Sequence, residues 1–119
     1  MNATNMTYTT LLEQRIRNFF DANGIAYEGK SMMGGTCFMV NGKMCVGVTK
    51  DRLMARIDPA AQEEALKKPG CKPMDFTGRP MRGFVFIERP GVETAPQLAA
   101  WLSLALEFNP KAKASKKRK

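Results

Sequence analysis

Residues 24–31, GIAYEGKS, fit every fixed position of the phosphate-loop pattern G-x-x-x-x-G-K-[ST]. In a working phosphate loop a strand comes first and a helix follows, so that the amides of the helix N-terminus meet the phosphate. Here the order is reversed, because Gly24 is predicted to end a helix and a strand is predicted after Ser31. Glu28 would also repel a phosphate. We therefore reject Gly24–Ser31 as a nucleotide site.

Other kinds of catalytic chemistry lack their usual residues. The chain contains no histidine, which excludes hydrolases that depend on a Ser-His or Cys-His couple. The carboxylates show no paired spacing of the kind that acid–base catalysis uses. The three cysteines include no C-x-x-C pair, so neither a disulfide framework nor a zinc site is predicted. We expect no enzyme, no metal and no cofactor.

The three cysteines are expected to differ in exposure. Cys37 and Cys45 fall on expected strands and are interpreted as small buried hydrophobic residues. Cys71 follows Gly70 in an expected loop, and we predict that it is the most exposed of the three thiols.

Residues 82–89, RGFVFIER, match four of the seven specified positions of an RNA-binding strand pattern. Phe84 and Phe86 share one face of this strand and could stack on bases. The chain opens with a helix, however, whereas the RNA-binding module opens with a strand that carries the partner aromatic residue. Packing of both rings in the core is the favoured interpretation, with Arg79 and Arg82 kept as candidate nucleic-acid contacts.

The net charge of +8 is concentrated at the C-terminal end. The last nine residues, KAKASKKRK, carry six basic and no acidic side chains, which leaves a net charge of +2 for residues 1–110. Such a segment cannot form a packed core and is expected to be disordered. It would attract nucleic-acid phosphates without reading sequence, or serve only as a solubilising end. The candidate contacts are Lys111, Lys113, Lys116, Lys117, Arg118 and Lys119.

Helix and strand signals alternate along the chain. Thr10 begins a capping-box pattern, Asn41-Gly42 predicts a hairpin, Asp58-Pro59 begins a second helix, and Thr94 caps a third. With a two-residue turn, the hairpin would pair Phe38 with Cys45 and Cys37 with Val46. The expected helices are 11–22, 59–67 and a third between Thr94 and Asn109, and the expected strands are 36–40, 43–48, 52–57, 74–76 and 83–88.

This order, α-β-β-β-α-β-β-α, predicts an α+β domain with a meandering antiparallel sheet and helices packed on it. We expect a flexible N-terminus over 1–9, one domain over 10–109 and a disordered basic tail over 110–119. No apolar run approaches a membrane span and no secretory signal is visible, so a cytoplasmic protein that does not contact membranes is expected.

Methionines make both faces of the expected sheet apolar. Met33, Met39 and Met44 lie on or beside the hairpin strands, with Met39 and Met44 expected on the face of Cys37 and Val46. Because helices packed on one side cover only one face, the other face is predicted to meet a protein partner or a second copy of the chain.

From Lys30 onward the sequence resembles the N-terminal domain of the TfoX/Sxy family, bacterial relatives of competence regulators. The resemblance covers roughly residues 10–108 and rests on the stretches MMGG, CFMVNGKMC, LMAR and KPMDFTGRPMRGFVF, with the helix that contains Trp101. It implies an α+β domain without known enzymatic activity. Longer members add a C-terminal helical domain, not expected here, and act as accessory activators alongside the cyclic-AMP receptor protein.

The leading hypothesis is therefore a non-enzymatic accessory domain in transcriptional regulation of the competence type. It would contact a protein partner, part of the transcription machinery or a regulator, through an apolar sheet face. The alternative is a sequence-tolerant nucleic-acid-binding protein that uses the basic tail.

Overall fold

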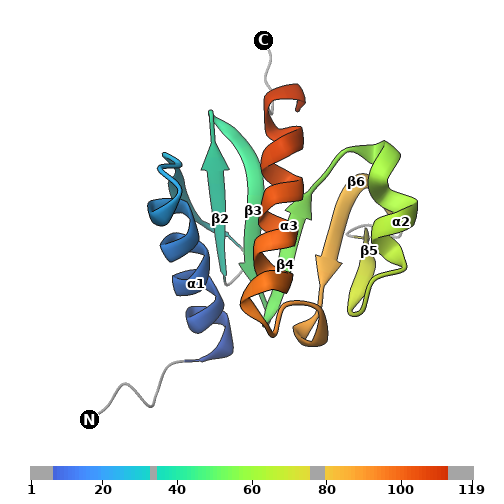
Figure 1. Cartoon of the computed structure of the whole chain (residues 1–119), viewed down its shortest axis with the longest axis horizontal. Coiled ribbons are helices and arrows are strands. Elements are labelled where there is room, and N and C mark those ends of the chain that lie inside the picture. Colours follow the sequence, from blue (N-terminus) through green and yellow to red (C-terminus); the bar gives the residue numbers. More distant parts are fainter. Residues whose placement is uncertain (1–6, 33–34, 76–79, 113–119) are drawn as a thin grey trace.

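The computed structural model describes residues 7–32, 35–75 and 80–112. Six antiparallel strands form one sheet, and three helices pack on one of its faces (Figure 1). The strand order is β1-β2-β3-β4-β6-β5. The predicted α+β class is confirmed. The helices are α1 (Tyr8–Ala22), α2 (Gln62–Leu66) and α3 (Ala95–Phe108), and the strands are β1 (Glu28–Met32), β2 (Gly35–Val40), β3 (Lys43–Thr49), β4 (Arg52–Arg56), β5 (Cys71–Asp75) and β6 (Pro80–Ile87).

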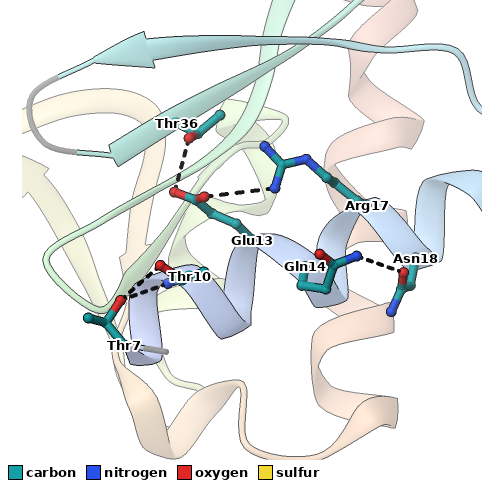
Figure 2. A network of polar contacts seen from close by, with 7 residues as sticks. All are labelled: Thr7, Thr10, Glu13, Gln14, Arg17, Asn18 and Thr36. Atoms are coloured by element: carbon teal, nitrogen blue, oxygen red, sulfur yellow. Dashed lines mark hydrogen bonds and ion pairs between the residues drawn. The ribbon is translucent and has the colours of Figure 1, made fainter. Parts of the chain in front are cut away.

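Helix α1 begins at Tyr8 and not at Leu11, because Thr7 and not Thr10 is its N-cap. The hydroxyl of Thr7 accepts a hydrogen bond from the backbone amide of Thr10 at 3.1 Å (Figure 2). The capping box predicted for Thr10 and Glu13 is therefore wrong. Glu13 is instead available to contact the sheet.

Polar contacts fix α1 on the sheet beside its buried residues. The hydroxyl of Thr36 on β2 donates to the Glu13 carboxylate at 3.0 Å, and Arg17 lies 3.8 Å from the same carboxylate (Figure 2). The Arg17 guanidinium also lies 5.2 Å from the ring centroid of Phe38. Below these groups α1 buries Leu12, Ile16 and Phe20. The apolar residues of α1 thus recur at helical spacing and face the sheet.

Strand β1 was missed by the sequence analysis, which expected five strands. It pairs only with β2 within the described residues, so it is one edge of the sheet. Its residues, EGKSM, carry no apolar alternation for a strand pattern to detect. The opposite edge is β5, which contains Pro73. Both edges therefore hold residues that are uncommon in the middle of sheets.

The β2–β3 hairpin turns at Asn41-Gly42 as predicted, but its register changes after two pairs. Met39 lies opposite Met44, whereas Phe38 lies opposite Val46, so Cys45 is an extra residue in β3. The predicted pairs of Phe38 with Cys45 and of Cys37 with Val46 are wrong because of this bulge. Val46 consequently joins the helix-covered core and not the face of Met39.

Asp58 and Thr94, the residues predicted to begin the second and third helices, are both observed as N-caps. Asp58 accepts a hydrogen bond from the amide of Ala60 at 3.0 Å, and a 3-10 turn, Pro59–Ala61, leads into α2. Thr94 and Gln97 form the predicted capping box of α3. The predicted bounds of the second helix, 59–67, therefore divide into a 3-10 turn and a shorter α-helix.

The C-terminal end of α3 is fastened to the hairpin by one buried side chain. Asn109 is 2% exposed, and its amide nitrogen donates to the carbonyl of Val40 at 3.1 Å. Its side-chain oxygen accepts a hydrogen bond from the side-chain amide of Asn41 at 2.8 Å. Lys43 donates to the carbonyl of Asn109 at 3.2 Å. The predicted helix stop at Asn109 is thus also a tertiary contact.

The main core lies between the sheet and the helices. It combines aliphatic and aromatic residues of α1 and α3 with alternate residues of the central strands. Leu98, Trp101, Leu102 and Ala105 lie on one face of α3 and are buried. The fully buried strand residues of this core are Phe38, Val46, Val48, Leu53, Ala55, Val85 and Ile87.

Candidate functional site: the helix-free face of the sheet

A second apolar cluster lies on the opposite face of the sheet. Met54, Met74 and Phe86 are buried in it, and Met44 and Phe84 pack against them. Because successive strand residues point to opposite faces, Met54 and Phe86 point away from the core that holds their strand neighbours. None of the described helices covers this side (Figure 1). We call it the helix-free face and define it by Lys30, Cys37, Met39, Met44, Arg52, Met54, Arg56, Lys72, Met74, Phe84 and Phe86.

Two arginines of β4 lie over the phenylalanine rings of this face. The guanidinium carbon of Arg52 is 3.8 Å from the ring centroid of Phe86, and that of Arg56 is 5.3 Å from that of Phe84. Such contacts hold the cation over the electron-rich ring while part of the guanidinium edge stays available for a further partner. Sequence analysis did not single out these arginines, although Arg52, Met54 and Arg56 follow the spacing of one strand face.

The two phenylalanines share one face, as the RNA-binding pattern predicted, but they do not pack in the main core. Phe86 is buried and Phe84 is half-buried, both in the second cluster. Both rings therefore pack in an apolar cluster, as the favoured interpretation of core packing predicted, but this cluster lies on the helix-free face and the rings lie under arginines.

Of the methionines predicted to contact a partner, Met39 and Met44 lie opposite each other and are half-buried. The thiol of Cys37 lies 3.7 Å from the sulfur of Met39. Met33 lies outside the described residues. This corner of the helix-free face is thus lined by polarizable sulfur atoms, which adapt well to an irregular partner surface.

The structure brings together Arg82 and Lys111, two of the predicted nucleic-acid contacts, in one cavity of about 370 Å³. Arg82 comes from β6 and Lys111 from the turn after α3. Arg56, Phe84 and Phe108 line the same cavity, and the sequence analysis did not foresee their part in it. The other predicted contacts lie outside the described residues: Arg79, Lys113, Lys116, Lys117, Arg118 and Lys119.

A glycine shapes the wall of this cavity. Gly83 has φ +83°, and a Cβ there would lie 3.0 Å from the carbonyl oxygen of Ile57. The Gly83 carbonyl accepts from the amide of Ile57 at 2.7 Å, and its amide donates to Gln62 at 2.6 Å. Because these backbone groups are already paired, the side-chain cations are left as donors to a ligand.

The thiols are buried and poorly suited to nucleophilic chemistry. Cys71 has the largest exposed fraction of the three thiols, as predicted, but at 9% it is still buried. It is the first residue of β5 and not part of a loop, and it belongs to the main core. Burial raises its pKa to about 11, against an opposing effect of Lys68. Burial raises the pKa of Cys45 to about 12, with a smaller contribution from Cys37. Burial also raises the pKa of Cys37, and Lys30 opposes this. A raised pKa disfavours the reactive thiolate at neutral pH.

The stretch that resembles a phosphate loop has the predicted order of elements. Helix α1 precedes it, Gly24 ends that helix with φ +68°, and β1 runs from Glu28. Among the described residues, no three acidic, cysteine or histidine side chains cluster in a way that could hold a metal ion. Nor does any described helix have the length and apolar character needed to cross a bilayer.

Comparison with protein families agrees with the fold. The TfoX N-terminal domain matches residues 17–109, from α1 to the residue that fastens α3 to the hairpin. Comparisons with curated proteins and with solved structures gave no significant match. The family match covers every strand of the sheet, the C-terminal part of α1 from residue 17, and all of α3. The chain therefore belongs to the TfoX N-terminal domain family, a group of competence-related regulatory domains.

Proposed function

We propose that this chain is a non-enzymatic accessory domain of transcriptional regulation that docks its helix-free face on an acidic surface of a protein partner. The observation that supports this most directly is the pair of arginines, Arg52 and Arg56, held over Phe86 and Phe84 beside half-buried methionines. Arginine and aromatic residues with methionine are the types enriched at protein interfaces.

The charge of the helix-free face favours an acidic partner. Sheet register places Lys30, Arg52, Arg56 and Lys72 on this side. The acidic groups beside them are Glu28, on the edge strand, and Glu88, which lies 3.8 Å from Lys72. Arg52 and Arg56 form no ion pair with any described carboxylate. Complementary charge would speed association and orient the partner, while the methionines and rings supply apolar contact.

Family membership supports the regulatory part of the proposal. The buried thiols and the histidine-free sequence support a role in binding and not in catalysis. The candidate partners are the cyclic-AMP receptor protein, which the family resemblance implies, and RNA polymerase, as a part of the transcription machinery. Both can be purified from the host and tested one at a time.

The deciding experiment measures binding of the full chain to each purified factor, for the wild type and for the double variant Met44→Glu with Arg52→Glu. We expect at least about a tenfold loss of affinity, since the change introduces repulsive charge at the apolar centre of the surface. Lys68→Glu is the matched control, because Lys68 is exposed in the loop before β5 and outside the helix-free face.

Equal affinities of the wild type and the double variant for a factor would overturn the proposal that the helix-free face is the docking surface. Binding by neither factor, together with an unchanged transcript profile when the gene is deleted, would overturn the regulatory role. Proton NMR spectra of each variant establish that the fold is intact before affinities are compared.

A further inference from the structure

The cavity beside the helix-free face collects positive charge without a built-in counter-ion. It is lined by Arg56, Arg82 and Lys111, and none of the described residues that line it is acidic. These three cations form no ion pair within the described part of the chain. Like charges that share a concave site repel each other, and an anion that enters the site relieves this repulsion.

Acidic residues lie nearby but line other hollows. Asp58 and Glu107 belong to a neighbouring hollow that shares Lys111 and Phe108 with this cavity. Glu63 lines a hollow on the other side of Arg82. A ligand in the cavity itself is therefore surrounded by cations and by the rings of Phe84 and Phe108.

The cavity lies where the ends of β4 and α3 meet the start of β6. Figure 1 shows the C-terminal end of β4, the start of β6 and the C-terminal end of α3 together at the top of the view. Arg56 ends β4, Arg82 lies near the start of β6, and Lys111 follows α3. Arg56 is further held by its contact with Phe84. The donors are thus fixed by secondary structure and not by a long loop.

We infer that this cavity binds a nucleotide phosphate, with the phosphate on Arg56, Arg82 and Lys111 and the sugar or base against Phe84 and Phe108. Arginine forks match phosphate oxygens in a bidentate manner. The volume of about 370 Å³ is at the lower end of the range of about 300–1,000 Å³ for small-molecule sites. It therefore suits one nucleotide and not an extended cofactor.

The nucleotide in the cavity could come from two sources: a free mononucleotide, or one nucleotide of a single-stranded nucleic acid. The basic tail bears on the second source, because Lys113 follows Lys111 by two residues in the sequence. The cavity shares Arg56 and Phe84 with the helix-free face, whereas Arg82 and Lys111 lie outside that face as defined above. Variants at Arg82 and Lys111 therefore test nucleotide binding separately from protein docking.

Calorimetry and amide NMR on the full chain test the inference with three probes: adenosine monophosphate, a ten-nucleotide oligodeoxyadenylate and inorganic phosphate. Arg82→Gln and Lys111→Gln should each weaken binding of the nucleotide probe by about tenfold or more, as expected for a lost hydrogen bond to a charged group. Lys30→Gln is the control, with the same loss of charge on β1 at the far edge of the sheet.

A fourth variant replaces Lys113, Lys116, Lys117, Arg118 and Lys119 with Gln in the full chain. If adenosine monophosphate binds and Arg82→Gln weakens this binding, the cavity is assigned to free nucleotides. Oligonucleotide binding that is weakened by Arg82→Gln and survives the tail variant assigns it to nucleic acid. The inference is overturned if no probe binding responds to Arg82→Gln or Lys111→Gln, or if the tail variant alone abolishes all binding. Inorganic phosphate that binds as tightly as the monophosphate would overturn the nucleotide assignment.

Discussion

The two faces of the sheet are built from different residues. The helix-covered face holds β-branched and aliphatic side chains with Phe38 and Trp101 in one continuous core. The helix-free face holds methionines and phenylalanines under Arg52 and Arg56. Stiff, closely packed side chains specify one fold, whereas flexible sulfur-containing chains and stacked cations adapt to a second molecule. The difference supports the proposal that the helix-free face binds a partner while the helix-covered face stabilises the domain.

The largest expected effect comes from shortening a side chain in the helix-covered core. Leu53 is fully buried, so Leu53→Ala should lower the free energy of unfolding by about 2–5 kcal/mol. Met44→Ala on the helix-free face should cost only about 1 kcal/mol, because Met44 is half-buried. Urea denaturation followed by Trp101 fluorescence measures both. Equal losses would show that the two faces contribute alike to stability.

The next effect tests the polar fastening on the helix-covered side. Asn109→Ala removes the donor to the carbonyl of Val40 and the acceptor for Asn41. Leaving a buried carbonyl unpaired should cost about 1–3 kcal/mol. Ser103→Ala, an exposed change on α3, is the control in the same denaturation assay. A loss no larger than that of the control would mean that water replaces the amide without penalty.

A pH effect follows from the buried thiols. Burial raises the pKa of Cys45 to about 12, above its value of about 8.5 in an unfolded chain. The neutral thiol therefore contributes stability that is complete below about pH 8.5 and is lost as the pH rises toward 12. Denaturation at pH 7.5, 9 and 10 under reducing conditions should show a steeper loss for the wild type than for Cys45→Ala. Parallel pH profiles would contradict this expectation.

The smallest effect on stability is expected at the arginines of the helix-free face. Arg52→Gln removes the cation from the Phe86 ring and should change the free energy of unfolding by about 0.5–1 kcal/mol. Lys50→Gln is the control, because Lys50 is an exposed turn residue two positions before Arg52. If Arg52→Gln lowered the free energy of unfolding as much as Leu53→Ala, the main role of Arg52 would be to stabilise the fold and not to bind a partner.

The sequence supported the fold better than the site. Alternation, the Asn-Gly turn and the caps at Asp58 and Thr94 predicted the α+β class, because these signals depend on neighbouring residues. Strand β1 was missed because its pairing with β2 is tertiary and its side chains are polar. The bulge at Cys45 changed which residues share a face, and no local signal marks it.

The site was predicted only in part for a related reason. Arg82 and Lys111 were chosen for charge, but their common cavity depends on where β6 and the end of α3 meet. Arg56 and Phe108 complete that cavity from two other places in the sequence. Distances of this kind are set by the packing of the whole domain, which a residue pattern does not encode.

The two edge strands have a consequence for how this domain behaves at high concentration. Lys30 and Glu28 on one side, and a proline without an amide hydrogen on the other, make the sheet a poor template for further strands. Chains that meet in a crowded cell should therefore not polymerise through their sheets. Another molecule would then bind to a face of the domain and not add strands at its edges. The domain would remain a discrete six-stranded unit in such an assembly.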